Sequence, residues 1–88
     1  MLQEYSVVDL FCGIGGLSHG FIQEGFLVDA GIDSDPACIF AYEANNSSTF
    51  IHADVAELSA ARLETLFTRK RKILIGCAPC QPFSSYTF

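Results

Sequence analysis

The sequence lacks the features that would place the protein in a membrane or outside the cell. None of its apolar runs approaches the roughly 20 residues that a membrane-spanning helix needs. Its N-terminus has no basic segment leading into an apolar stretch, so it does not have the form of a secretory signal peptide. We therefore expect a cytoplasmic protein without membrane contact, in which the four cysteines are thiols rather than disulfides.

Basic side chains are also scarce. Five Lys and Arg residues stand against ten Asp and Glu, which gives a net charge of −5. Because nucleic-acid-binding surfaces are usually basic, the chain by itself is a poor candidate for one. The single basic cluster, Arg69–Lys72, is interpreted as a solvated helix end, stabilised by the helix dipole, that leads into a strand.

The 88 residues have enough apolar content for the core of one small domain, since half of them are hydrophobic and eight are Phe. Apolar periodicity, Gly and Pro positions and capping residues predict an alternation of strands and helices. The expected strands are 5–10, 26–32, 49–52 and 72–75, and the expected helices are 17–24, one that follows Asp35-Pro36, and 59–69. This βαβαβαβ order predicts an α/β, Rossmann-like parallel sheet with right-handed crossovers.

A glycine-rich turn follows the first strand, where Gly13, Gly15 and Gly16 let the backbone approach a ligand closely. The dinucleotide fingerprint needs a third glycine at its sixth position, which is Ser18 here, so a nicotinamide cofactor is disfavoured. Parallel sheets bind ligands beyond the carboxyl ends of their strands, and the turn lies at such an end. We expect a nucleoside-like ligand without a pyrophosphate.

Acidic residues follow the second and third strands. Asp33 comes about 20 residues after the glycine turn, where a carboxylate commonly binds ribose hydroxyls, and Asp54 ends the next strand. Each has a structural alternative: Asp33 as a turn residue, and Asp54 as a helix cap that forms a capping box with Glu57. Asp35 is interpreted as a helix cap alone. A hydroxylated sugar and an amine-bearing base, as in S-adenosylmethionine, suit this set.

A thiol framed by prolines follows the last strand. Pro79 and Pro82 stiffen the backbone around Cys80, whose thiolate would be a soft nucleophile suited to an electron-poor ring carbon. The alternative is a redox pair with Cys77, although such pairs lead into a helix and Pro82 opposes one. No metal site is expected, because Cys12, Cys38, His19 and His52 lack the paired spacing of zinc ligands. We interpret these two cysteines as small core residues and the two histidines as structural or surface residues.

With these features in place, the chain resembles the DNA (cytosine-5)-methyltransferases over nearly its whole length. Residues 9–16 resemble the first motif of that family, 31–36 the second, 53–57 the third, and 76–85 the fourth, which carries a Pro-Cys-Gln sequence. The first and fourth motifs are very specific, whereas the second and third are weak alone. The resemblance implies the N-terminal portion of an S-adenosylmethionine-dependent methyltransferase fold.

The resemblance also implies roles for individual residues. The wall of the S-adenosylmethionine pocket would be formed by Phe11, Gly13, Ile14, Gly15 and Gly16. Asp33 would bind the ribose hydroxyls, Ser34 would border the adenine, and Asp54 with Val55 alongside would accept from the adenine amine. Pro79 and Cys80 would meet the target cytosine of double-stranded DNA, with Cys80 adding to C6 so that C5 becomes methylated.

The resemblance further implies that parts of the family's catalytic domain are missing. The Glu-Asn-Val motif that protonates the cytosine and the target-recognition domain do not occur in residues 1–88. We therefore expect a partial catalytic domain that is inactive alone, that associates with a C-terminal half, a partner chain or itself, and whose DNA-binding surface lies elsewhere. The alternative is a non-catalytic S-adenosylmethionine-binding or assembly module that needs a partner chain.

Overall fold

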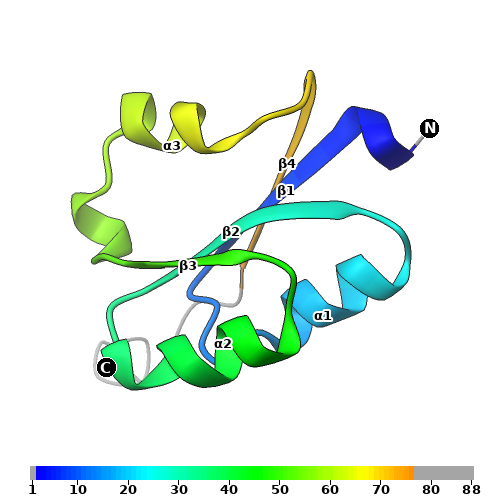
Figure 1. Cartoon of the computed structure of the whole chain (residues 1–88). Helices are drawn as coiled ribbons and strands as arrows, with labels where there is room; N and C mark the ends of the chain where they lie inside the picture. Colours follow the sequence, from blue (N-terminus) through cyan, green and yellow to red (C-terminus); the bar gives the residue numbers. More distant parts are fainter. Residues whose placement is uncertain (1, 77–88) are drawn as a thin grey trace, which may run out of the picture.

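The structure, a computed structural model, describes residues 2–76 and has the predicted α/β organisation (Figure 1). The strands are β1 (Tyr5–Leu10), β2 (Leu27–Asp33), β3 (Thr49–His52) and β4 (Arg71–Gly76). The helices are α1 (Gly16–Gln23), α2 (Ile39–Asn45) and α3 (Ala60–Leu66), with short 3-10 turns at Leu2–Glu4, Pro36–Cys38 and Val55–Glu57. The predicted βαβαβαβ alternation is confirmed, and two of the four strands have the predicted bounds.

All strand pairs are parallel, in the order β3-β2-β1-β4. The carboxyl ends of the strands therefore meet at one edge of the sheet. There Leu10 pairs with Ile32 on one side and with Gly76 on the other, and Asp33 pairs with His52. In Figure 1, α1 and α2 lie together on one side of the sheet and α3 lies on the other, as right-handed crossovers require for this strand order.

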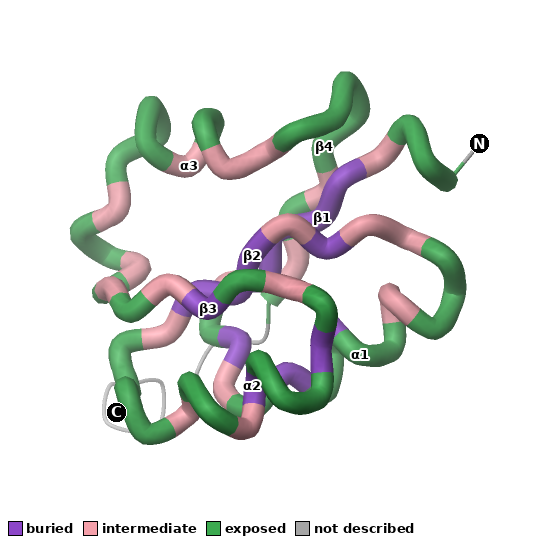
Figure 2. The backbone as a smooth tube through the Cα atoms, viewed as in Figure 1, coloured by how far each residue is buried: buried purple, intermediate pink, exposed green. Residues whose placement is uncertain are grey.

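The core is centred on β1 and β2, the two inner strands. Their buried apolar side chains are Val7, Val8, Val28, Ala30 and Ile32, and Figure 2 shows the buried backbone concentrated in these strands and near the end of α2. Since β-branched side chains pack well in the inner strands of a parallel sheet, this composition explains why these segments are strands.

The capping signals predicted from the sequence are confirmed at two helix ends. Gly25 has a φ of 97°, and its amide donates to the Ile22 carbonyl at 3.0 Å. A glycine tolerates this left-handed conformation at a helix end. Asp35 accepts from the Ala37 amide at 3.0 Å and caps the 3-10 turn that Pro36 begins.

The third helix is shorter than predicted, and the interpretation of the basic cluster as a helix end is wrong. The helix ends at Leu66; the amide after it still donates to the Glu64 carbonyl at 3.4 Å, but the following two amides bind outside the helix. The Thr68 amide and hydroxyl donate to the Asp29 carboxylate at 2.8 and 2.9 Å, and the Arg69 amide donates to the Ser6 hydroxyl at 3.2 Å. Two of the four basic residues therefore lie in a bend and two begin β4.

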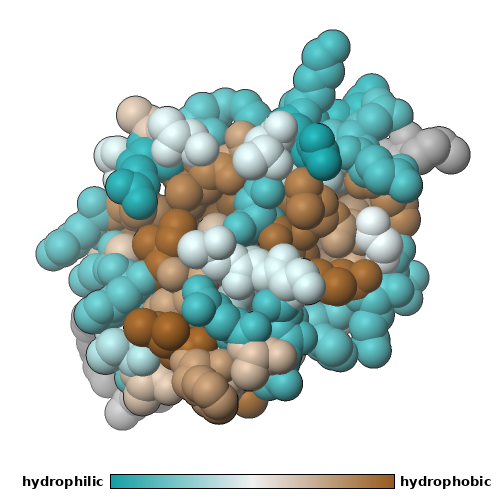
Figure 3. Space-filling view, viewed as in Figure 1, coloured by the Kyte–Doolittle hydropathy of each residue, from teal (hydrophilic) through white to brown (hydrophobic). Residues whose placement is uncertain are grey.

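The face of the sheet on which α3 lies is covered only loosely. No residue of α3 is buried, and Leu74 on β4 is half exposed. Figure 3 shows apolar atoms at the surface between α3 and the strands. Within residues 2–76, no helix has the length and apolarity to cross a bilayer.

Candidate functional site

The glycine-rich turn connects β1 to α1 at the carboxyl edge of the sheet. Its backbone has three left-handed residues, Phe11 (φ 58°), Gly13 (φ 53°) and Gly15 (φ 89°). The Cys12 amide donates to the Ile32 carbonyl of β2 at 3.0 Å, and the Gly15 amide donates back to the Cys12 carbonyl at 2.8 Å. These bonds bend the turn and attach it to the neighbouring strand.

Asp33 lies directly against this turn. Its Oδ2 accepts from the Gly13 amide at 2.9 Å, and its Oδ1 accepts from the Asp35 amide at 3.0 Å. The bond from the Asp35 amide corresponds to the alternative interpretation of Asp33 as a turn residue. The bond from the Gly13 amide joins the predicted ribose carboxylate to the predicted cofactor loop. A carboxylate has about four lone-pair positions, so this half-buried side chain keeps acceptor capacity for a ligand.

The glycines of the turn have different surroundings. A Cβ at Gly15 would collide with the side chains of Tyr42 and Asn46, so protein packing explains that glycine. A Cβ at Gly13 or Gly16 would meet no atom within 4 Å. These two glycines therefore border open space, where a ligand can approach the backbone.

Other predicted cofactor residues also lie around this edge. Phe11 and Ile14 are exposed, Ile14 to 63%. Ser34 is exposed, and its carbonyl lies 3.0 Å from Nε2 of His52 at the end of β3. Phe11 and Ile14 therefore give the edge exposed aromatic and apolar side chains beside the open glycines, and Ser34 adds a polar one.

The Asp54 side chain forms a hydrogen bond with the backbone two residues further along the chain. Its Oδ1 accepts from the Ala56 amide at 2.9 Å and caps the 3-10 turn in which Val55 is half buried. Asp54 is therefore a cap as predicted, although the predicted capping box with Glu57 is not among the described hydrogen bonds, and the exposed carboxylate keeps free acceptor positions.

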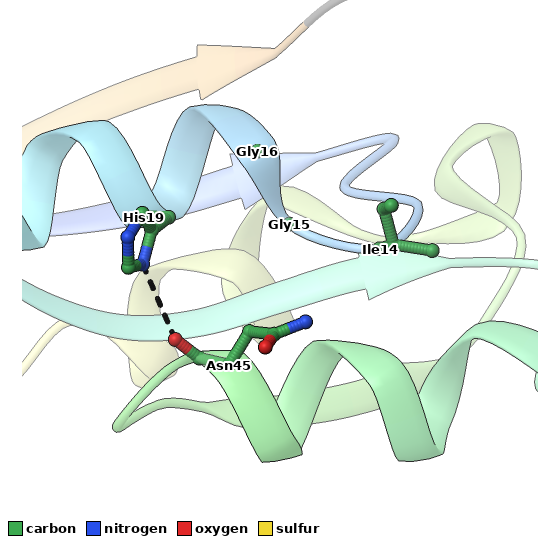
Figure 4. A pocket seen from close by; sticks show the side chains of 5 residues that line it. All are labelled: Ile14, Gly15, Gly16, His19 and Asn45. Atoms are coloured by element: carbon green, nitrogen blue, oxygen red, sulfur yellow. Dashed lines mark hydrogen bonds between the residues drawn. The ribbon is translucent and has the colours of Figure 1, made fainter.

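A hollow of about 250 Å³ adjoins the turn on the helix side. Figure 4 shows the residues that line it, Ile14, Gly15, Gly16, His19 and Asn45. His19 Nδ1 lies 3.3 Å from the Asn45 carbonyl, so this ring spans from α1 to α2. The prediction that His19 and His52 are structural or surface residues agrees with their exposed positions and backbone contacts.

Sequence reasoning missed a buried polar chain beneath the turn. Ser18 Oγ donates to Asp9 Oδ2 at 2.7 Å and lies 2.9 Å from the Tyr42 hydroxyl, which donates to Ser48 Oγ at 2.9 Å. Burial raises the pKa of Asp9 despite its hydrogen bond from Ser18. Two features of the sequence could have revealed this series of hydrogen bonds: an aspartate within an apolar strand, and a serine at the sixth position of the dinucleotide fingerprint.

Of the two described cysteines, Cys12 has the predicted core position and Cys38 is only partly buried. Cys12 is buried and packs with Tyr42 and Phe50, and Cys38 packs against this cluster. Burial, reinforced by the Asp9 and Asp33 carboxylates, raises the pKa of Cys12 to about 12. This thiol is therefore no nucleophile near neutral pH. No group of His, Cys, Asp or Glu within residues 2–76 could hold a metal ion.

The predicted nucleophile, Cys80, and its neighbour Pro79 lie outside the described residues, as does Cys77. The strand that precedes them is described. Gly76, the last residue of β4, pairs with Leu10, the residue before the glycine-rich turn. A Cβ at Gly76 would lie 2.7 Å from the Leu10 carbonyl oxygen, so glycine permits this close pairing.

Comparison with known proteins gives one consistent result. The family model for C-5 cytosine-specific DNA methylases matches residues 5–87. The chain is 55% identical over 83 residues to the type II methylase M.HgiDII of Herpetosiphon aurantiacus, covering 93% of this chain and 23% of that protein. It is 38% identical to M.HgiDI of the same organism (89% and 25%) and 41% identical to M.XorII of Xanthomonas oryzae (88% and 19%), both type II methyltransferases. The chain therefore spans about a quarter or less of the length of each of these three relatives.

Proposed function

Because this chain belongs to the C-5 cytosine-specific DNA methylase family, we propose that it is the cofactor-binding and nucleophile-bearing part of a DNA cytosine methyltransferase. The methyl donor would be S-adenosylmethionine, and the substrate would be cytosine in double-stranded DNA. The contact between the Gly13 amide and the Asp33 carboxylate carries this proposal, because it joins a glycine turn to a ribose-type acceptor at one strand edge.

The described residues fit this cofactor. Gly13 and Gly16 border open space, so the ligand can approach the turn without meeting a side chain. Asp33 would bind the ribose hydroxyls, and Ser34 would border the adenine. Asp54, with Val55 beside it, would accept from the adenine amine. Phe11 and Ile14 would contribute apolar surface beside the turn.

Cys80 would supply the covalent chemistry on the base. The target cytosine must leave the stack, because its reacting carbons cannot be reached within the duplex. The Cys80 thiolate would then add to C6, forming a carbon–sulfur bond and raising the electron density at C5. When bound, S-adenosylmethionine supplies the electrophilic methyl group that C5 needs. Loss of the C5 proton to a base would restore the C5–C6 double bond and expel the Cys80 thiolate.

The position of β4 supports this role for Cys80. Gly76 lies beside Leu10, so β4 ends at the same edge as the glycine turn, four residues before the cysteine. Pro79 would meet the target base next to Cys80. A shared cleft for cofactor and base requires β1 and β4 to end at the same edge of the sheet, and this pairing supports such a cleft.

Further protein would be needed for methylation. The net charge of −5 leaves little basic surface for a duplex, and the three compared relatives are at least four times as long as the match. We propose that a C-terminal half or partner chain holds the DNA and contributes the acid that protonates the base. Within the described sheet, the half-exposed Leu74 and the outer edge of β4 are a surface suited to such a partner.

Two measurements test the proposal. Calorimetry of the 88-residue chain with S-adenosylmethionine should detect binding in the wild type and in a Cys80→Ser variant alike. Transfer of a labelled methyl group to duplex DNA should require the remainder of the 55%-identical relative and should be lost in Cys80→Ser. Full transfer by Cys80→Ser would refute the assigned nucleophile. Cofactor binding without transfer in any combination would instead favour a non-catalytic binding or assembly module.

A further inference from the structure

Tyr42 lies where the glycine turn, α2 and β2 meet. The side chain is fully buried, and its ring fills the space that two glycines leave. A Cβ at Gly31 would lie 2.5 Å from Tyr42 Cζ, and a Cβ at Gly15 would lie 2.6 Å from Tyr42 Cδ2. Gly15 ends the turn, and Gly31 lies two residues before Asp33 on β2. The ring therefore packs against both the turn and the strand that the hydrogen bond between Gly13 and Asp33 joins.

The Tyr42 hydroxyl group connects further elements. It lies 2.9 Å from Ser18 Oγ on α1 and donates to Ser48 Oγ, just before β3, at 2.9 Å. Ser18 in turn donates to Asp9 on β1. Phenylalanine would fill the same volume without a group to satisfy, so packing alone does not account for a buried hydroxyl at this position.

Asn46 adds a second connection between this region and the turn. Its Nδ2 donates to the Tyr42 carbonyl at 3.0 Å and to the Gly15 carbonyl at 3.4 Å. The end of α2 is thus bonded to the last residue of the turn by a buried amide. Side chain and backbone of Tyr42 both take part in fixing Gly15.

We propose that Tyr42 is a positioning residue for the cofactor loop. Its ring and hydroxyl hold the glycine turn at the distance from β2 at which the Gly13 amide meets Asp33. The side chain has no exposed surface and so does not touch a ligand itself. This inference rests on the proposed function only for the identity of the ligand, because the positioning concerns the unliganded chain.

The test is a Tyr42→Phe variant, studied by amide hydrogen exchange and by calorimetry with S-adenosylmethionine. Exchange at the Gly13 and Gly15 amides should accelerate about fivefold relative to the Val7 and Val8 amides of β1, which is the scale expected for one lost buried hydrogen bond. The dissociation constant for the cofactor should rise by a similar factor, measured well below the unfolding temperature.

Phe50→Leu provides the matched control. The Phe50 ring packs on the Tyr42 ring with centroids 5.8 Å apart, so the variant weakens the same cluster and keeps the hydroxyl. Its melting temperature should fall while the relative exchange at the turn and the dissociation constant stay at wild-type values. If Tyr42→Phe does not fold, Ser18→Ala removes the hydroxyl's link to Asp9 without altering the ring and should give the same two changes.

The outcomes separate this inference from the proposed function. The inference is overturned if Tyr42→Phe or Ser18→Ala is destabilised like Phe50→Leu but keeps wild-type relative exchange at Gly13 and Gly15. If the wild-type chain does not bind S-adenosylmethionine, the cofactor assignment fails, and the exchange measurement still decides whether Tyr42 positions the turn.

Discussion

Asp9 carries a buried carboxyl group near the carboxyl end of β1. It is 1% exposed, and burial raises its pKa above that of an ordinary aspartate. The folded state therefore holds the Asp9 proton more tightly than the unfolded state does. Both states are protonated at low pH, so this site favours folding there. Its contribution is lost as the pH rises through the folded pKa.

We expect Asp9→Asn to show this effect. An asparagine has no charge to bury, and its amide can donate to Ser18, so the variant should gain stability relative to the wild type as the pH rises. Urea unfolding at about pH 4 and about pH 7 measures the free energy of unfolding of both chains. An equal difference between the two chains at both pH values would show that Asp9 does not titrate with folding.

The Cys12 thiol should be inert in the folded chain. With a pKa of about 12 and 7% exposure, it has almost no accessible thiolate at pH values near neutrality. Iodoacetamide followed by peptide mass spectrometry should leave Cys12 unmodified until urea is added. Modification of Cys12 in the native chain at the rate seen in urea would contradict its place in the core.

At the scale of the elements, the packing of α2 against β2 depends on the absence of a side chain at Gly31. In Gly31→Ala the new methyl group would meet the buried Tyr42 ring at 2.5 Å. Overpacking of this kind costs about 1–3 kcal/mol, so we expect the free energy of unfolding to fall by about that amount in chemical denaturation.

Gly20→Ala is the matched control for that substitution. Gly20 lies within α1, and its Cβ would meet no atom within 4 Å. Alanine should therefore stabilise the helix by about 0.5–1 kcal/mol. If the two variants had equal stability, the close contact at Gly31 would not be a feature of the folded chain.

Local signals were sufficient to predict most elements. Strand 5–10 followed from its β-branched run, and the end of α1 followed from Gly25, because both depend on neighbouring residues. The end of α3 was not predictable in this way. It depends on Asp29, which binds the Thr68 amide across 39 positions of sequence. No propensity or periodicity within residues 59–69 contains that information.

In the candidate site, too, the features that depend on local sequence were predictable and those that depend on distant contacts were not. The glycine turn and Asp33 were identified from their spacing after two strands, and the structure places them in contact. Tyr42 was not singled out from the sequence. Its contacts are with Gly15, Gly31, Ser18 and Ser48, which the fold brings together from four different segments around α2.

At the scale of the whole molecule, the exposed apolar surface predicts association. Phe40 is 83% exposed, Ile14 63% and Leu74 50%, and β4 is an edge strand of the described sheet. Such edges and patches are sites of protein contact. Sedimentation velocity should show self-association with rising concentration, and addition of the relative's remaining portion should replace it with a one-to-one complex. Monomeric behaviour under both conditions would count against a role of these exposed side chains and this edge in association.

We propose that Cys80 attacks cytosine in a cleft shared with the glycine turn. The most direct measurement is mass spectrometry of the chain, completed with the relative's remaining portion, after reaction with S-adenosylmethionine and duplex DNA containing 5-fluorocytosine. Fluorine cannot leave C5 as a proton does, so the thiol cannot be expelled. We predict a covalent link between the base and Cys80. An adduct at Cys77 or Cys12, or methylated DNA without any adduct, would contradict the account.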